Sequence, residues 1–128
     1  MSKRAFIVDD NKIVPQLVRA SLENRLEHID CVEAADGLEA IECAPELKPD
    51  VIVLDLCMPV MNGLEAAAAL HRLLPRVPII LYTLHKDIVP ESCVHALGIR
   101  AVVSKTDQIG VLLEQILRFS GLANAASV

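Results

Sequence analysis

Short runs of β-branched and aliphatic residues alternate along the chain with stretches in which apolar residues recur every three or four positions. Such runs, bounded by polar or turn residues, are typical of strands buried on both faces of a parallel sheet. They predict five strands, the second at an edge because acids interrupt it, at residues 5–8, 29–33, 51–54, 78–82 and 101–104. The helical spacing predicts five helices, at about residues 12–26, 38–43, 64–74, 90–97 and 107–119. Five strand–helix units with right-handed crossovers give a three-layer α/β sandwich.

Prolines and glycines set the expected ends of these helices. Pro15 is tolerable only in a first turn, so the first helix should start near residue 12. Pro45 and Pro75 are expected to end the second and third helices. Pro90 should open the fourth helix, which Gly98 then caps.

Polar side chains follow four of the predicted strands. Asp9 and Asp10 come after the first strand, Asp55 after the third, Thr83 ends the fourth and Lys105 follows the fifth. In an open parallel sheet, functional groups gather at the carboxyl ends of the strands. We therefore expect three carboxylates, one hydroxyl and one ammonium to converge at a single edge.

This set of groups suits phosphoryl transfer. Two carboxylates about 4 Å apart repel each other by about 4 kcal/mol at an effective dielectric constant of about 20. A hard divalent cation removes that penalty, and Mg²⁺ prefers oxygen ligands while keeping some of its waters. A nucleophilic carboxylate can form an acyl phosphate, and a metal ion and a lysine can neutralise charge on the transferring group.

Composition narrows the function classes. Lys and Arg number 12 against 17 Asp and Glu, which gives a net charge of −5, and aromatic residues make up only 2% of the chain. An acidic chain with few aromatic side chains is a poor nucleic-acid binder. The apolar stretches are too short for a membrane span, and no secretory signal is recognisable. Four cysteines without metal or disulfide spacing favour free thiols in the cytoplasm.

The ordered motifs resemble the receiver domain of bacterial two-component response regulators. The matching pieces are Val-Asp-Asp-Asn at 8–11, Glu-Ala-Ala-Asp-Gly-Leu-Glu-Ala at 33–40, Asp-Leu-Cys-Met-Pro-Val-Met-Asn-Gly at 55–63, Thr83, and Ser-Lys at 104–105. The resemblance implies a flavodoxin-like fold with strand order 2-1-3-4-5. It places the receiver domain at residues 1–120 and leaves residues 121–128 as a flexible C-terminal tail.

The resemblance also implies a metal site. The residue matching Asp10 binds Mg²⁺ directly, and the one matching Asp9 supports it, often through water. Asp55 is a second ligand, and the backbone carbonyl of Cys57 supplies a third.

Further roles follow from the same resemblance. Asp55 is the phosphoacceptor, Thr83 bonds a phosphoryl oxygen, and Lys105 pairs with the carboxylate or the phosphoryl group. The donor would be a sensor histidine kinase or a phosphotransfer protein. The output would be altered affinity for a downstream protein, with a phosphorylation-dependent homodimer as a further candidate. The chain would be either a stand-alone regulator or the receiver of a longer one.

Several positions depart from the family pattern. Thr106 stands where proline is common, so we expect the peptide bond before it to be trans, because a cis bond there costs about 2.5–4 kcal/mol. Val102 replaces an aromatic residue, and Leu84 replaces a small one that would leave the site entrance open. Cys57 and His85 occupy the variable positions that tune phosphoryl lifetime.

Three alternatives compete with this interpretation. A haloacid-dehalogenase phosphatase needs a second acid two residues after the nucleophile, where this chain has Cys57. A flavin carrier needs a Ser/Thr-rich phosphate loop and aromatic side chains. A pseudo-receiver would act as a docking module without phosphorylation. The complete set of site residues favours a phosphoacceptor over these, and therefore a signalling domain that is not an enzyme.

Overall fold

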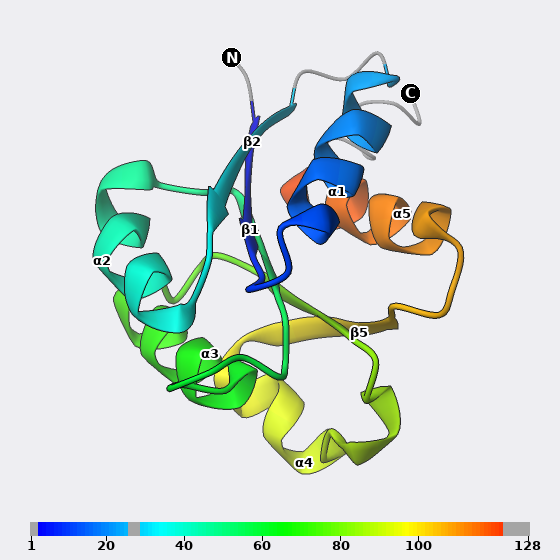
Figure 1. Ribbon diagram of the computed structural model, residues 1–128. Helices are drawn as coiled ribbons and strands as arrows, with labels where there is room; N and C mark the ends of the chain where they lie inside the picture. Colours follow the sequence, from blue (N-terminus) through cyan, green and yellow to red (C-terminus); the bar gives the residue numbers. More distant parts are fainter. Residues whose placement is uncertain (1–2, 26–28, 122–128) are drawn as a thin grey trace.

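A computed structural model describes residues 3–25 and 29–121. Its centre is one parallel sheet with the strand order β2-β1-β3-β4-β5 (Figure 1). The strands are β1 (Lys3–Val8), β2 (Ile29–Ala34), β3 (Val51–Leu54), β4 (Ile79–Thr83) and β5 (Ile99–Ser104). The predicted fold class, strand order and edge position of β2 are confirmed. Of the predicted tail, residues 121–128, all but Gly121 lie outside the described residues.

Helices cover both faces of the sheet. Helices α1 (Ile13–Glu23) and α5 (Ile109–Ser120) lie on one face, and α2 (Gly37–Leu47), α3 (Gly63–Leu73) and α4 (Glu91–Val94) lie on the other (Figure 1). Two short 3₁₀ turns, η1 (Lys86–Ile88) and η2 (His95–Leu97), flank α4. Within the described residues, no helix is both long enough and apolar enough to cross a membrane.

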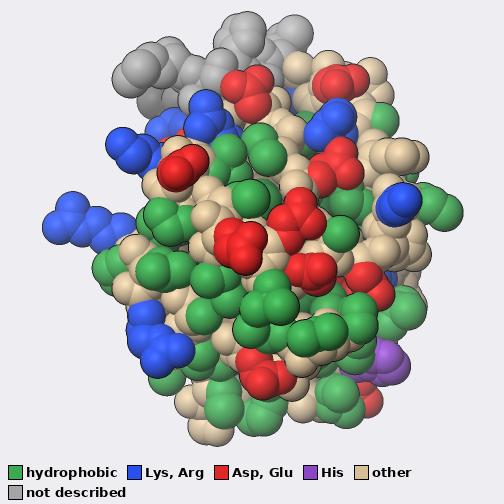
Figure 2. All heavy atoms as spheres, turned by 60° about the vertical axis from the view of Figure 1, so that its left-hand side comes forward, with side chains coloured by type: hydrophobic (Ala, Val, Ile, Leu, Met, Phe, Trp, Pro, Cys, Tyr) green, Lys and Arg blue, Asp and Glu red, His purple; other side chains and the backbone are tan. Residues whose placement is uncertain are grey.

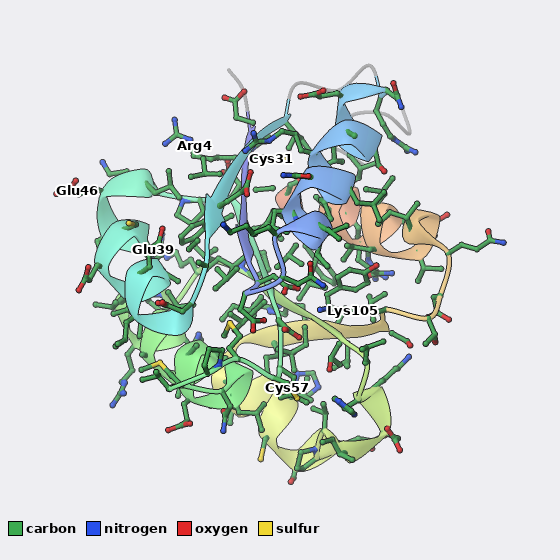
Figure 3. All side chains as sticks on the ribbon, in the orientation of Figure 1. Arg4, Cys31, Glu39, Glu46, Cys57 and Lys105 are labelled. Atoms are coloured by element: carbon green, nitrogen blue, oxygen red, sulfur yellow. The ribbon has the colours of Figure 1, made fainter. Side chains whose placement is uncertain are left out.

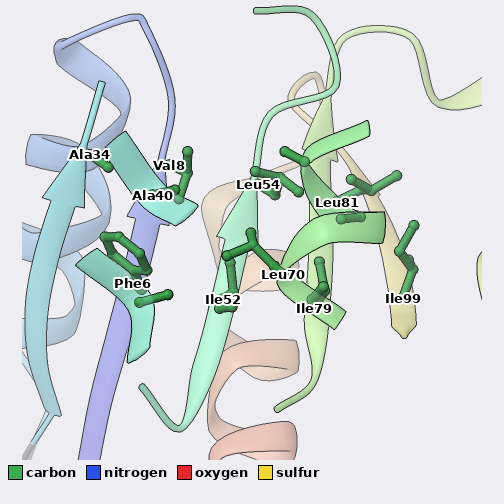
Figure 4. Close-up of a cluster of buried hydrophobic side chains, with 13 residues drawn as sticks. Phe6, Val8, Ala34, Ala40, Ile52, Leu54, Leu70, Ile79, Leu81 and Ile99 are labelled. Atoms are coloured by element: carbon green, nitrogen blue, oxygen red, sulfur yellow. The ribbon is translucent and has the colours of Figure 1, made fainter. Parts of the chain in front are cut away.

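The alternation of side chains along each strand divides the core into two layers. Phe6, Ile52 and Leu54 pack toward α2 and α3, in the cluster drawn in Figure 4. Ile7 and Val53, their neighbours in the sequence, pack toward α1 and α5. Because both faces are buried, these strands have the continuous apolar runs from which they were predicted.

The predicted end of the second helix is wrong. Helix α2 continues through Pro45 to Leu47. Pro45 has no N–H to donate, but the final turn is closed because the N–H of Lys48 donates to the carbonyl of Ala44 (3.0 Å). The guanidinium of Arg4 on β1 also donates to the Leu47 carbonyl, a long-range contact that the local sequence does not reveal.

Helix α4 is shorter than the sequence predicts. After Pro90, regular α-helix covers only Glu91–Val94, and the chain continues as the turn η2 to Gly98, which is left-handed as a helix cap (φ 73°). The start of α4 has no side-chain cap, and neither α4 nor η2 contains a buried residue. Without a cap or a buried face, little tertiary packing stabilises a longer helix here.

Candidate functional site

The carboxyl edge of the sheet brings the five predicted residues together. One carboxylate oxygen from each of Asp9, Asp10 and Asp55 lies within 4.8 Å of the others. Asp9 and Asp55 are 4% and 6% exposed, whereas Asp10 faces solvent. Thr83 ends β4 beside this cluster, and Lys105 directly follows β5.

Lys105 bridges two of the acids. Its Nζ lies 2.8 Å from Asp9 Oδ2 and 3.4 Å from Asp55 Oδ1. In Figure 3, Lys105 comes from the chain after β5, while Cys57 lies on the loop after β3. The lysine was expected to pair with the Asp55 carboxylate or with a phosphoryl group. It does lie within ion-pair distance of Asp55, and it makes a second, shorter contact with Asp9 that was not expected.

Asp9 is held from its other side by the backbone. Its Oδ1 accepts a hydrogen bond from the N–H of Asn11 (2.8 Å), and Asn11 Oδ1 accepts one from the N–H of Ile13 at the start of α1 (2.9 Å). Sequence reasoning missed this role of Asn11. An Asn two residues after an Asp, just before a helix, is a recognisable Asx-turn signal.

The charges of the cluster do not balance. Burial, followed by the negative charge of Asp9, raises the pKa of Asp55, and Lys105 offsets this only in part. Burial lowers the pKa of the Lys105 ammonium, but its hydrogen bond to Asp9 and the charges of both acids outweigh burial and raise that pKa. The cluster therefore has three carboxylates and one ammonium, and the metal ligands it offers are all oxygen atoms. Such a site fits a hard divalent cation such as Mg²⁺.

The side chain of Thr83 is oriented by the loop after β4. It is fully buried, and its Oγ1 accepts a hydrogen bond from the N–H of His85 (2.9 Å). The Thr83 carbonyl accepts from the N–H of Lys105 (2.8 Å), which joins the ends of β4 and β5. Because the Oγ1 acts as an acceptor toward His85, its hydrogen remains free to be donated.

The loop after Asp55 is tightly packed against its own backbone. The N–H of Gly63 donates to the carbonyl of Leu56 (2.7 Å), and a Cβ at Gly63 would overlap the Asp55 carbonyl oxygen. Asn62 caps α3 in a reciprocal capping box with Glu65. Sequence reasoning treated this stretch only as a loop, although Asn followed three residues later by Glu resembles a capping-box signature.

The departures from the family pattern lie around this site. No peptide bond in the described residues is cis, so the bond before Thr106 is trans as predicted. Cys57 and His85 are exposed, and Leu84 is 62% exposed. Leu84 lines a groove of about 640 Å³ that Val102 and Val94 also line.

Comparison with known proteins identifies the family. Residues 5–117 match the response regulator receiver domain. The chain therefore belongs to the family of receiver domains, which bind Mg²⁺ in an acidic site, act in two-component signalling, and interact with histidine kinases or phosphotransfer proteins.

Individual relatives and structures agree with this assignment. The chain is 35% identical over 83 residues to the chemotaxis protein CheY of Halobacterium salinarum, covering 65% of this chain and 68% of that protein. It is 34% identical over 99 residues to a protein-glutamate methylesterase/protein-glutamine glutaminase of Pyrococcus abyssi, covering 77% of this chain but only 27% of the relative. A solved structure with the same fold is the receiver domain of the sensor histidine kinase PA1611 of Pseudomonas aeruginosa, which holds a magnesium ion in its active site cleft. It has a TM-score of 0.80 at 23% identity, with 94% of this chain and 99% of that chain covered.

Proposed function

We propose that this domain accepts a phosphoryl group on Asp55 from a sensor histidine kinase or a phosphotransfer protein in the cytoplasm, and thereby changes its affinity for a downstream protein. The observation that carries the proposal is the convergence of three carboxylates and Lys105 at one edge of the sheet. The domain acts as a phosphoacceptor and has no substrate of its own to turn over.

The residues have complementary roles in the transfer. A carboxylate oxygen of Asp55 attacks the phosphorus, the new O–P bond forms, and the bond to the donor nitrogen or oxygen breaks as that atom keeps the electron pair. Lys105 neutralises negative charge on the phosphoryl group, and the Thr83 hydroxyl donates a hydrogen bond to one of its oxygens.

A bound Mg²⁺ would supply further positive charge against the phosphoryl oxygens. Asp10, Asp55 and the Cys57 carbonyl would hold this ion directly. Asp9, which is already bonded to Lys105 and to the Asn11 N–H, supports the site. This division follows the family resemblance, and it agrees with Asp10 facing solvent while both carboxylate oxygens of Asp9 already accept hydrogen bonds.

Phosphorylation by a small-molecule donor tests the acceptor residue. With acetyl phosphate and Mg²⁺, the intact mass of the protein should rise by one phosphoryl group. Asp55→Asn should abolish the increase, while Asp87→Asn, which changes an exposed acid beyond β4, should leave it intact. A mass increase that persists in Asp55→Asn would contradict the proposal.

The metal site has its own test. Titration with Mg²⁺ should perturb the amides around Asp10 and Cys57, and Asp10→Asn should weaken binding strongly because a charged ligand is lost. A titration that Asp10→Asn leaves unchanged would show that the ion binds elsewhere.

Apolar side chains beside the site support a protein donor. Ile13 and Leu17, at the start of α1, are 70% and 48% exposed. We expect Ile13→Ala to slow transfer from a phosphotransfer protein without slowing transfer from acetyl phosphate. Leu73→Ala is the matched control, since Leu73 is 46% exposed at the far end of α3.

A further inference from the structure

One contiguous segment of the chain is strongly acidic. Residues 29–71, from β2 to α3, carry nine of the 17 Asp and Glu residues but only one of the 12 Lys and Arg residues, Lys48. Figure 2 shows the side of the molecule on which α2 comes forward. Acidic side chains lie near its centre, and basic ones lie mainly toward its margins. Two of the nine acids are paired with cations from other segments, Glu33 with Arg19 and Asp55 with Lys105. The remaining acids outnumber Lys48 and give this side a negative field toward an approaching partner.

Exposed apolar side chains lie within this acidic segment. Val60 is 89% exposed and Leu38 is 49% exposed. Met61, which follows Val60, is half-buried: its side chain packs against the core and on Gly37 beside Leu38, where a Cβ would lie 3.0 Å from the Met61 sulfur. We call Leu38, Val60 and Met61 the Val60 patch. Hydrophobic side chains also gather near the centre of the face in Figure 2.

Val60 is unusual for a second reason. Its backbone is left-handed (φ 70°), a conformation that β-branched residues rarely adopt. Burial does not compensate this strain, because the side chain contacts mostly solvent. A strained and exposed apolar residue beside a functional loop suggests a binding role, since such strain clusters at ligand contacts.

The acids around the patch are fixed in place. Asp36 accepts a hydrogen bond from the N–H of Glu39 (2.8 Å), and the Glu39 carboxylate accepts one from the N–H of Ala35 (3.2 Å). Glu65 accepts from the N–H of Asn62 (3.2 Å). The carboxylates at the starts of α2 and α3 are therefore held beside the apolar side chains and do not sweep freely through solvent.

We infer that the Val60 patch docks a protein segment that carries a bulky apolar anchor flanked by Lys or Arg. The apolar side chains would bury the anchor, and the fixed carboxylates would pair with the flanking cations. The same negative field repels nucleic acid and anionic membrane surfaces, which makes both unsuitable occupants. This docking goes beyond phosphoryl transfer and does not require Asp55 to be modified.

A designed peptide tests the inference. The probe is a synthetic peptide with a central leucine pair between lysines, added to ¹⁵N-labelled protein in excess Mg²⁺ so that the metal site is saturated. We expect amide shifts at residues 36–39 and 60–62 and an affinity that falls as salt is added. A charge-reversed peptide with glutamates should not bind, and a peptide with serines in place of the leucines should bind more weakly.

Variants make the test specific. Val60→Gly removes the apolar side chain while relieving the strained backbone, so weaker binding cannot be attributed to unfolding. Loss of a buried valine contact should weaken binding about tenfold. Leu73→Ser, at an exposed site outside the patch, should bind as the wild type does. No phosphoryl donor is present in this experiment, so its result does not depend on whether the proposed phosphorylation of Asp55 occurs.

Several outcomes would overturn the inference. One is equal binding by wild type and Val60→Gly, and another is a set of amide shifts centred outside residues 36–39 and 60–62. Binding to anionic vesicles would assign the face to a membrane. Self-association of the wild type that Val60→Gly abolishes would assign it to a second copy of the chain.

Discussion

Helices α3 and α4 pack on the same face of the sheet but are held in very different ways. Helix α3 has eleven residues, a reciprocal capping box at its start and four buried residues, among them Ala67 and Leu70. Helix α4 has four residues, no side-chain cap and no buried residue. Across residues 84–97, which include η1, α4 and η2, no side chain is buried at all.

This difference separates a fixed part of the site from an adaptable part. Asp55, the proposed phosphoacceptor, leads into the loop that α3 anchors, whereas Thr83 leads into the lightly packed segment 84–97. Segments with few buried contacts open at low free-energy cost. We therefore expect chemistry at Asp55 to be read out as movement after Thr83.

The largest expected effect comes from the buried face of α3. Leu70 is completely buried, so Leu70→Ala should lower the free energy of unfolding by about 3 kcal/mol, through lost burial and a cavity. Val94 on α4 is only partly buried, so Val94→Ala should cost less than about 1 kcal/mol. Urea unfolding monitored by circular dichroism measures both. Similar losses in the two variants would remove the contrast between the helices.

How much of the fold could be predicted depends on whether a feature is set by local sequence or by distant contacts and packing. The strand runs, the burial on both faces and the strand order implied by the family resemblance are confirmed. They depend on local apolar patterns that the sheet reinforces. The end of α2 was missed because Pro45 was expected to stop the helix, whereas the helix continues to Leu47. The Leu47 carbonyl accepts a hydrogen bond from Arg4, more than forty positions away in the sequence. The shortness of α4 was missed because Pro90 and Gly98 mark the ends of a helix but not its packing.

The candidate site was predictable for a related reason. Asp9, Asp10, Asp55, Thr83 and Lys105 all sit at or just after strand ends, and the parallel topology brings those ends together. The partners that orient them were less visible. The contact of Lys105 with Asp9 and the hydrogen bond from the His85 N–H to Thr83 are geometric facts that spacing does not encode.

A second prediction concerns the tight loop in the fixed part. In Gly63→Ala, the added Cβ would overlap the Asp55 carbonyl oxygen and lie 2.7 Å from Leu56 Cα. Backbone atoms cannot move aside easily, so we expect a loss of about 2 kcal/mol in unfolding free energy. Gly110→Ala is the control, because nothing lies within 4 Å of its Cβ position in α5, and alanine there should stabilise by about 0.5–1 kcal/mol. An unaffected Gly63→Ala variant would mean that the loop can move away from the added Cβ and is not tightly packed.

The third prediction is that a substitution in the site, Asp55→Asn, stabilises the folded protein when Mg²⁺ is absent. The raised pKa of Asp55 means that the folded protein holds its proton to higher pH than the unfolded chain does. Stability therefore falls as pH rises from the ordinary carboxyl pKa through the raised one, and the ionised group is a net cost at neutral pH. Without Mg²⁺, Asp55→Asn should raise the melting temperature slightly at pH 7, and the difference should shrink in acid. Mg²⁺ should favour the wild type, because the ion binds its folded state.

A fourth prediction tests whether the lightly packed segment carries the signal. Beryllofluoride with Mg²⁺, a mimic of the phosphoryl group, should shift the amides of residues 84–91 more than those of β5. Val102 is short and stiff at its single χ angle, so it cannot swing between buried and exposed positions as a ring can. Thr83→Ala should therefore uncouple partner binding from phosphorylation more completely than Val102→Ala does. Equal uncoupling by the two variants would make the valine part of the switch.

The smallest expected effect comes from Val60, which is strained although it lies in the fixed part of the site, on the loop between Asp55 and α3. Val60→Gly relieves a left-handed conformation that costs an L-residue about 1–2 kcal/mol. The greater freedom of glycine in the unfolded chain opposes this gain by about 0.4–1 kcal/mol, so the net stabilisation should be about 0.5 kcal/mol. Lys48→Gly is the matched control, because Lys48 is also left-handed (φ 52°) but is not β-branched, and its gain should be smaller. If Val60→Gly is no more stabilising than Lys48→Gly, the strain at Val60 is negligible, and the side chain alone would have to explain any role of this loop in docking.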